Sequence, residues 1–500
     1  MPKPQLIELR KHLLNNLGLN FTESREEELY KKIGFAAKEF NYKNTNAFIN
    51  WIANNNLNPN QIEKLAAFLT IGETYFLREI KALDYLEHTY LPDLIYKRRG
   101  KNQRLRIWCA GCSSGEEPYS IAIILKKVIP DIKNWNITIL ATDINATFLE
   151  KARTGIYTKW SFRGIPESFK TENFKEFGKD KFQINPEIQR MVTFSYQNLA
   201  KDTYPSLVNN TNAMDIILCR NVLIYFSDKG IKQVTTRLYN CLTKEGILVV
   251  SPVEMSNLIS PKFSRIQHNG ITIYKKDSRK VKHKEIIELG IPETIEISRA
   301  YQQHPKLEIN KPEVEPTNTI LEKNVQKNKI QEAQAKEEVS EYDQAVVLFE
   351  LGKFEEAENL LTNILTRNSI NSIAAISLLV KTKANLGKLD SAEILCKKAL
   401  QINKLDASLY YLMATIQQEQ GKNSDAISSL NRAIYLEPDF SLAHFSLGNL
   451  CTKSGKNNAG LKHYKNTLNI LATHDPNRML MESDGITAGR LTEIIRTMKE

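Results

Sequence analysis

The sequence lacks long apolar runs and has few cysteines. No uninterrupted apolar stretch approaches the ~18 residues needed to cross a bilayer, and apolar stretches such as Gly246–Val250 have the length of a strand. The first residues, MPKPQLIELRKHLL, contain no apolar core of a secretory signal. Six cysteines in 500 residues are too few for a disulfide framework. We therefore expect a reduced, cytoplasmic protein without direct membrane insertion.

Metal-ligand patterns and a strong charge excess are also missing. The eight histidines are scattered, and Cys109 and Cys112 form a CxxC without a second pair nearby, whereas a zinc site usually takes four ligands. The net charge of +11 is modest for this length, so it does not indicate a nucleic-acid partner. At about 100–200 residues per domain, the length predicts two to four domains. We expect no metal and no nucleic acid.

The patterning divides the chain into segments of different character. Residues 1–79 predict a helical subdomain, because leucines recur at helical spacing up to Gly18 and amphipathic segments follow. Residues 80–276 alternate strands and helices, which is typical of an α/β doubly wound domain with a parallel sheet. The expected strands are Arg104–Cys109, Trp135–Ala141, Met191–Tyr196, Met214–Cys219, Gly246–Ser251 and Gly270–Tyr274, and the helices include Pro118–Val128, Ala146–Thr154 and Lys229–Leu242.

The second half of the chain predicts a linker followed by helical repeats. Residues 277–340 are rich in Lys, Glu, Gln, Asn and Pro with one aromatic, a composition typical of a flexible charged linker. In residues 341–475, glycines recur about every 34 residues, at Gly352, Gly387, Gly421 and Gly455, which is the tetratricopeptide period. The third repeat matches best, and the alternative is an ordinary helical bundle. The solenoid predicts a protein partner or a regulatory role, and residues 476–500 a capping helix or tail.

Two acidic positions follow expected strands, where ligands bind in an open parallel sheet. The loop AGCSSGEEP ends with Glu116, Glu117 and Pro118, and Pro118 suits a first helical position. The alternative is a helix cap with two solvated glutamates. Asp143 ends the next strand, where it is placed either to bind ribose hydroxyls or to cap the following helix. Together these features favour an adenosine-bearing ligand such as S-adenosylmethionine.

Two further stretches carry polar and aromatic side chains at element boundaries. CRNVLIYF places Arg220 and Asn221 directly after a buried strand, and Tyr225 shares a face with Asn221 if this turn is helical; the alternative for Tyr225 is a core position. GETYFLRE places Thr74 and Arg78 at the junction of the helical segment and the sheet domain.

Residues of about 10–276 resemble the chemotaxis receptor methyltransferases of the CheR family. The matching motifs are GETYFLRE, AGCSSGEEPYSIAI, ATDI with LEKARTGIY, Asn198-Leu199 and CRNVLIYF. The resemblance implies a helical subdomain packed on a methyltransferase domain, S-adenosylmethionine as methyl donor, and Arg78 and Tyr225 near the methyl group and the acceptor. The implied cofactor-binding residues are Gly72, Thr74, Arg78, Glu116, Asp143, Asn198, Leu199, Arg220 and Asn221; Gly72 stands where many members have Asn.

The resemblance also implies methylation of glutamate side chains in the cytoplasmic domain of a chemoreceptor. Residues 158–190 replace the region where some members carry a small β-subdomain that docks a receptor tail. The basic run from Lys97 to Arg106 is either a surface that steers an acidic receptor or a solvated face. Two alternatives stay open: a methyltransferase for another substrate, and a scaffold in which the repeats alone function. The repeats either target the enzyme to a partner or fold back on it.

Overall fold

The computed structural model describes residues 3–256, 258–276, 340–367, 373–476, 478–483 and 486–499. The predicted linker therefore lies outside the described residues, except for Ser340. None of the helices within these ranges is long and apolar enough to cross a membrane.

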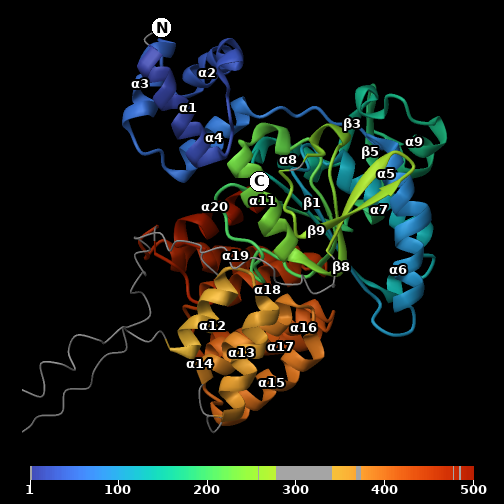
Figure 1. Ribbon diagram of the computed structural model, residues 1–500, viewed down its shortest axis with the longest axis vertical. Helices are drawn as coiled ribbons and strands as arrows, with labels where there is room; N and C mark the ends of the chain where they lie inside the picture. The colour runs from blue at the N-terminus through green and yellow to red at the C-terminus, as the bar shows by residue number, and fades with distance from the viewer. Residues whose placement is uncertain are drawn as a thin grey trace, which may run out of the picture. The chain divides into compact units, whose positions relative to one another are not determined.

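The N-terminal segment forms the expected helical subdomain (Figure 1). Its helices are α1 (Lys3–Leu17), α2 (Glu26–Glu39), α3 (Thr45–Asn54) and α4 (Pro59–Leu69). Gly18 ends α1 with a φ of +71°, a left-handed conformation that glycine adopts without steric cost. Apolar side chains spaced along these helices share one core, which includes Leu9, Leu29, Ile33 and Phe48.

A seven-stranded sheet forms the centre of the next domain, in the order β6-β2-β1-β7-β8-β10-β9. The strands are β1 (Arg104–Ala110), β2 (Asn136–Asp143), β6 (Val192–Tyr196), β7 (Met214–Leu218), β8 (Leu242–Val249), β9 (Phe263–His268) and β10 (Ile271–Lys276). The first five are parallel, whereas β10 pairs antiparallel with β8 and β9. The doubly wound prediction is confirmed, with an antiparallel hairpin at one edge. The strand order reverses between β1 and β7, and ligands bind at such a point.

Helices cover the sheet, and the side chains of β1 alternate between its two faces. The helices are α5 (Ile80–Tyr85), the π-helical turn Leu86–Tyr90, α6 (Leu91–Arg98), α7 (Glu116–Val128), α8 (Ala146–Thr154) and α11 (Asp228–Cys241). Leu105 and Ile107 pack with α5–α8, whereas Trp108 packs with α11 on the other face. Because alternate residues of a strand point to opposite faces, Arg104 and Arg106 lie on the same face as Trp108.

A second, three-stranded antiparallel sheet follows α8. It contains β3 (Ile156–Thr158), β4 (Phe174–Glu176) and β5 (Lys181–Ile184) in the order β3-β5-β4, with α9 (Glu167–Asn173) and the four-residue α10 (Pro186–Gln189). The prediction that residues 158–190 replace a small β-subdomain is therefore wrong. Strands of three or four residues carry too short a pattern to be recognised in the sequence.

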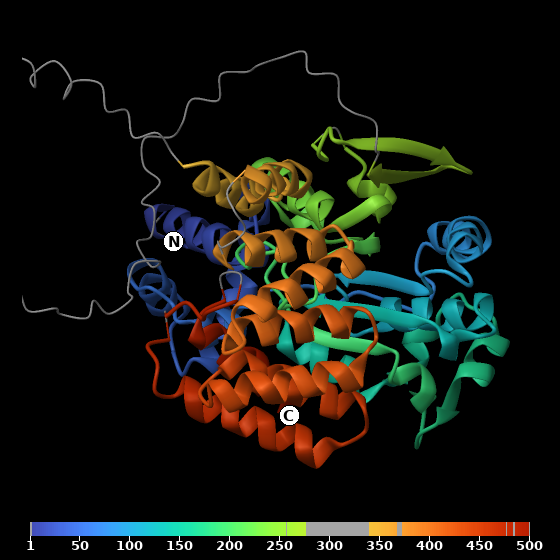
Figure 2. The same ribbon diagram turned by 90° about the horizontal axis from the view of Figure 1, so that it is seen from below.

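The C-terminal region forms successive helical pairs, as the glycine period predicted (Figures 1 and 2). The helices are α12 (Glu341–Glu350), α13 (Phe354–Arg367), α14 (Ile373–Asn385), α15 (Leu389–Ile402), α16 (Ala407–Glu419), α17 (Asn423–Leu436), α18 (Ser441–Lys453) and α19 (Asn457–Leu471), followed by α20 (Ala488–Lys499). All four repeat glycines have positive φ, between 69° and 78°. Three of these glycines are followed, five positions later, by a fully buried alanine: Ala357, Ala392 and Ala426. Their small side chains let the two helices of each pair approach closely.

Candidate cofactor site

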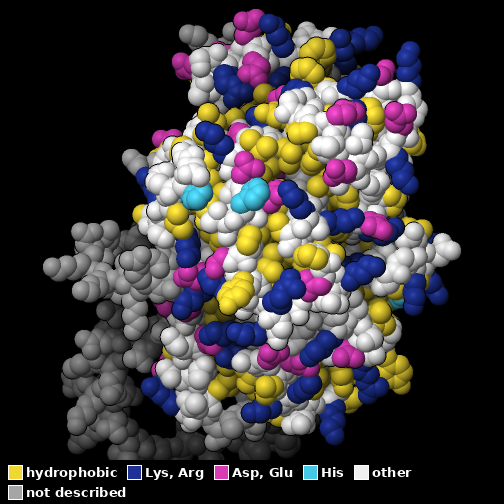
Figure 3. Space-filling model, turned by 90° about the vertical axis from the view of Figure 1, so that its right-hand side faces the viewer, with side chains coloured by type: hydrophobic (Ala, Val, Ile, Leu, Met, Phe, Trp, Pro, Cys, Tyr) yellow, Lys and Arg dark blue, Asp and Glu magenta, His cyan; other side chains and the backbone are white. Residues whose placement is uncertain are grey.

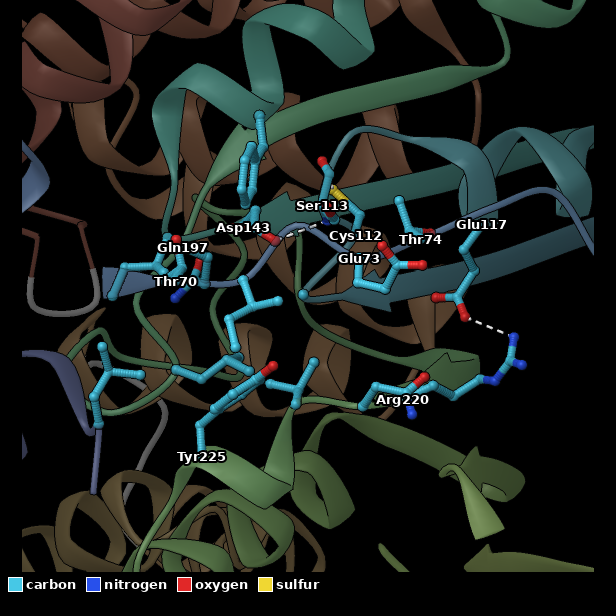
Figure 4. Close-up of a pocket in the computed structure, with 18 of the residues that line it drawn as sticks. Thr70, Glu73, Thr74, Cys112, Ser113, Glu117, Asp143, Gln197, Arg220 and Tyr225 are labelled. Atoms are coloured by element: carbon cyan, nitrogen blue, oxygen red, sulfur yellow. Dashed lines mark hydrogen bonds and ion pairs between the residues drawn. The ribbon is translucent and has the colours of Figure 1, made fainter. Parts of the chain in front are cut away.

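One cavity lies beyond the carboxyl ends of β1, β2 and β7, where the strand order predicts a ligand (Figure 4). The empty space within its walls, part of it open to solvent, is about 960 Å³. Its walls come from α1, the segment after α4, the β1–α7 loop, the end of β2 and the stretches after β6 and β7. Five sequence motifs that lie far apart in the chain therefore meet here.

The β1–α7 loop approaches the cavity through glycine and backbone N–H groups. Gly111 has a φ of +84° and its Cα faces Val222, so that a side chain at this position would overlap with Val222. Gly115, with a φ of +93°, is the N-cap of α7. The sequence suggested that Pro118 is the first residue of the helix. Because α7 begins at Glu116, Pro118 is instead the third. The buried thiols of Cys109 and Cys112 are free, and burial raises the pKa of both.

The two glutamates of this loop point to different places. Glu116 is buried away from the cavity, where its carboxylate accepts hydrogen bonds from the hydroxyls of Ser114 (2.8 Å) and Ser161 (3.0 Å). Glu117 lines the cavity and pairs with Arg220 at 2.9 Å. The structure thus places Glu117, which the sequence reading left out, where Glu116 was expected. Burial raises the pKa of Glu117, against the lowering effect of Arg220.

Asp143 is a buried carboxylate at the cavity wall. Its Oδ2 accepts a hydrogen bond from the Ser113 N–H at 2.8 Å, and its Oδ1 from the Asn145 N–H at 2.9 Å. Burial raises the pKa of Asp143 to about 6, against these two backbone N–H groups. The N-cap of α8 is Asn145, which bonds the Phe148 N–H, so the alternative role of Asp143 as that cap is wrong. The carboxylate keeps lone pairs available for hydroxyl groups of a ligand.

Arg220 joins the two sides of the cavity. Its guanidinium bonds Glu117 at 2.9 Å, Glu79 at 3.3 Å and the backbone carbonyl of Arg78. Its side chain is only 3% exposed. This geometry makes Arg220 a residue that fixes the backbone at Arg78. Arg78 itself lines the cavity, donates to the carbonyl of Glu73 and lies over the Tyr75 ring.

Tyr225 and Asn221 both line the cavity but do not share a helical face. Asn221 has a φ of +60°, and the turn is a short 3₁₀ helix over Leu223–Tyr225. Thr74 stands on the opposite wall from Tyr225 (Figure 4). The Tyr225 ring is half-buried, and burial raises its pKa, against the nearby charges of Arg25 and Arg78. Tyr225 thus faces the cavity, as expected for a site residue, and it also packs against the apolar core of the helical subdomain.

Asn198 and Leu199 lie at the wall as expected, next to Gln197, which sequence reasoning missed. The Asn198 side chain donates to the carbonyl of Asn16 at 2.8 Å, and thereby joins α1 of the helical subdomain to the cavity. Gln197 comes directly after β6, so its position at a strand end was the signal available for it.

Gly72 does not line the cavity. A side chain at Gly72 would overlap with the ring of Phe148, which itself lines the wall. Phe148 therefore occupies the space that a longer side chain at position 72 would need.

Several buried polar atoms around the cavity have no hydrogen-bond partner within the described residues: Ser113 Oγ, Gln197 Nε2 and Arg220 Nε. Burying such atoms without partners costs free energy, so a polar ligand that bonds them would relieve this cost. The wall also offers carboxylates, arginines and apolar surface from Ile144 and Phe148. This donor set fits a nucleoside joined to a charged amino acid.

The fold and this cavity define a methyltransferase domain that binds S-adenosylmethionine. Residues 72–269 match the family described as CheR methyltransferase, SAM binding domain, and residues 407–440 match the tetratricopeptide repeat. The chain belongs to the family of chemotaxis protein methyltransferases. The resemblance inferred from the sequence is thus confirmed, as is the third repeat, the one that resembles the tetratricopeptide pattern best.

Named relatives match between 41% and 50% of this chain. A chemotaxis protein methyltransferase of Borreliella burgdorferi is 34% identical over 50% of this chain and 88% of its own length. Chemotaxis protein methyltransferase 2 of Vibrio cholerae is 35% identical over 41% of this chain and 69% of its own length. A chemotaxis protein methyltransferase of Listeria innocua is 32% identical over 48% of this chain and 85% of its own length. Among solved structures, MamA 41-end from Desulfovibrio magneticus RS-1 is 17% identical over 27% of this chain and 76% of its own, with a TM-score of 0.26.

Proposed function

We propose that this protein transfers the methyl group of S-adenosylmethionine to glutamate side chains of a chemoreceptor cytoplasmic domain. The products are a glutamate methyl ester and S-adenosylhomocysteine. The observation that carries the proposal is the convergence of Arg78, Glu117, Asp143, Arg220 and Tyr225 on one cavity. The relatives' names, which specify chemotaxis, support the pathway.

Side chains of different charge and polarity face different parts of the cofactor. Asp143 offers carboxylate oxygens to ribose hydroxyls, and Glu117 offers a negative charge to an ammonium group. Ile144 and Phe148 supply apolar surface for a base, beside the amide of Gln197. Bound S-adenosylmethionine supplies an electrophilic methyl group on a positively charged sulfur.

No residue has to act as a general base. A glutamate acceptor has an ordinary pKa of about 4.3 and is already an anion at neutral pH. Arg78 is placed to hold this carboxylate and Tyr225 to orient its reacting oxygen. Leu17, Leu19 and Phe226 add apolar surface to the same cavity. Catalysis then rests on alignment and on removal of solvent from two opposite charges that neutralise each other.

The experiment is a methylation assay with radiolabelled S-adenosylmethionine and membranes from the same cell. We expect alkali-labile label in a chemoreceptor and a methyl ester on glutamate by mass spectrometry. Label in RNA or in a small molecule would instead support another substrate. Binding of the cofactor without transfer to any of these would favour the scaffold role of the repeats.

We further propose that the tetratricopeptide repeats bind a protein partner or regulate the methyltransferase. Among the described residues of the repeats, none lines the cavity. Helix α16 of the third repeat nevertheless contacts the methyltransferase domain through the buried carboxylate of Glu419.

A further inference from the structure

Two arginines at the beginning of β1 are buried against one glutamate of the third repeat. Arg104 Nη2 lies 2.5 Å from Glu419 Oε2, and Arg106 Nη1 lies 2.9 Å from Glu419 Oε1. The three side chains are 9%, 3% and 6% exposed. Asn136, on the neighbouring β2, donates to the backbone carbonyl of Glu419 at 2.8 Å. The end of α16 is thus fixed to the amino ends of two central strands.

This contact removes Arg104 and Arg106 from the exposed part of the basic run, whereas Lys97 and Arg99 remain at the surface. Arg98 bonds Asp215 through two nitrogens, at 2.5 and 2.8 Å, so three of the run's arginines are engaged in ion pairs within this chain. Burial lowers the pKa of Arg106 to about 10, against the charge of Glu419. On the face shown in Figure 3, Lys and Arg side chains are interspersed with Asp and Glu. A buried charge is tolerated only with a partner, so Glu419 is required wherever the two arginines are covered.

A loop of the methyltransferase domain enters the repeats beside this ion pair. Leu207 packs in an apolar cluster with residues of α14 and α16, including Val380 and Leu412, and Val208 packs against the cluster that contains Tyr411. Arg106 holds the other side of the loop, since it donates to the carbonyls of Asn210 (2.9 Å) and Asn212 (3.1 Å). The repeats thus already hold a segment of this same chain on the face that includes α14 and α16, which we call the inner face.

The same loop begins at the cofactor cavity. Leu199 lines the cavity, and its carbonyl accepts a hydrogen bond of 2.7 Å from the hydroxyl of Tyr204. The Tyr204 ring packs edge-on against Trp108, whose indole N–H bonds Thr142, the neighbour of Asp143. Leu199 at the cavity wall and Leu207, which is buried in the repeats, are therefore only eight positions apart, and the Tyr204 hydrogen bond braces the segment between them.

We propose that the repeats control cofactor affinity through the loop of residues 203–212, which we name the coupling loop. In the docked state the repeats hold Leu207 and Val208, and Tyr204 then fixes the wall at Leu199. When the repeats release the loop, for instance to a partner that takes the same inner face, the wall loses this support and cofactor affinity falls. This inference rests on the proposed function of the cavity.

The test compares full-length variants by binding of S-adenosylhomocysteine in calorimetry and by hydrogen exchange of the coupling loop. Glu419→Gln removes the charge that docks the repeats, and Leu207→Ser removes an apolar anchor. The matched control is Glu393→Gln, because Glu393 bridges Lys397 and Lys422 inside the repeats and makes none of these contacts. We expect both test variants to exchange faster in the loop and to bind about fivefold more weakly, as is usual for coupled sites. The control should do neither.

A measurement on the wild type needs no substitution and covers the case in which a variant fails to fold. Because coupling is reciprocal, S-adenosylhomocysteine should slow exchange in the coupling loop. Faster exchange in the variants at unchanged affinity, or wild-type exchange unaffected by bound ligand, would overturn the coupling alone. Absence of binding to the wild type would instead overturn the proposed function on which the coupling rests.

Discussion

Asp143 combines burial, two backbone hydrogen bonds and a place on the cavity wall. Its pKa of about 6, raised by burial, lies near the physiological range, so its charge depends on mild changes of pH. Above this pKa the carboxylate accepts hydrogen bonds with a full negative charge, and below it the neutral acid is a weaker acceptor.

We predict that affinity for S-adenosylhomocysteine falls as the pH is lowered through about 6. Asp143→Asn, which is neutral at every pH, should bind more weakly by about 1.5–3 kcal/mol at neutral pH and should lose this pH dependence. Calorimetry across the range measures both effects. Equal affinity of the wild type on both sides of the transition would remove Asp143 from the ligand contacts.

Arg78 and Tyr225 belong to the acceptor side of the cavity. We predict that Arg78→Ala lowers kcat roughly a hundredfold, the scale associated with a lost alignment, with only a modest loss of cofactor affinity. Tyr225→Phe should act in the same direction more weakly. The control is Arg99→Ala, since Arg99 is half exposed and pairs with Asp131 away from the cavity. Near-normal turnover of Arg78→Ala in the receptor assay would contradict its role.

At the scale of elements, the β1–α7 loop can pass close to Val222 because it has a glycine, Gly111, at the point of contact. We predict that Gly111→Ala costs about 1–3 kcal/mol of unfolding free energy from its left-handed backbone, and that it also displaces Val222 and weakens ligand binding. Urea unfolding and calorimetry measure these two losses.

Gly100→Ala is the matched control for this prediction. Gly100 has a similar positive φ of 71° but no atom within 4 Å of an added side chain. It should show the backbone cost without any change in affinity. Equal ligand binding by the two variants would show that the contact with Val222 does not matter.

The sequence predicted the cavity best where residues follow strands, because parallel strands bring their carboxyl ends to one edge. Asp143, Arg220 and Asn221 were found in this way. Successive side chains along a helix point about 100° apart. Which of Glu116 and Glu117 faces the cavity therefore depends on the residue at which α7 begins, and the sequence did not give that residue correctly. Glu116 came from the family resemblance, whereas the structure places Glu117 at the cavity wall.

At the scale of the whole molecule, the ion pair of Arg106 with Glu419 joins residues 313 positions apart. No local pattern in the sequence indicates such a pair. The sequence showed the basic run from Lys97 to Arg106, but it did not show that Arg104 and Arg106 are covered by the repeats. The repeat period, in contrast, was readable because it recurs within the segment itself.

We predict that Glu419→Gln destabilises the full chain by about 3–5 kcal/mol, because it leaves Arg104 and Arg106 buried without their partner. Arg106→Leu should cost less, because Glu419 keeps its ion pair with Arg104. The double variant should cost less than the sum of the two. Urea unfolding measures the cycle. Lys97→Gln, which removes an exposed pair with Asp93, should leave stability unchanged; additive losses in the cycle would mean that the two side chains do not interact.

The burial of Glu419 also restricts which repeat arrays this enzyme accepts in a chimera. An exchanged array must end the first helix of its third repeat with an acidic residue, and it must leave room for Asn136 beside the following glycine, as Gly421 does here. Arrays chosen for their ligand alone would leave Arg104 and Arg106 covered but uncompensated. Repeat exchange in this protein is therefore a problem of charge at one position before it is a problem of partner choice.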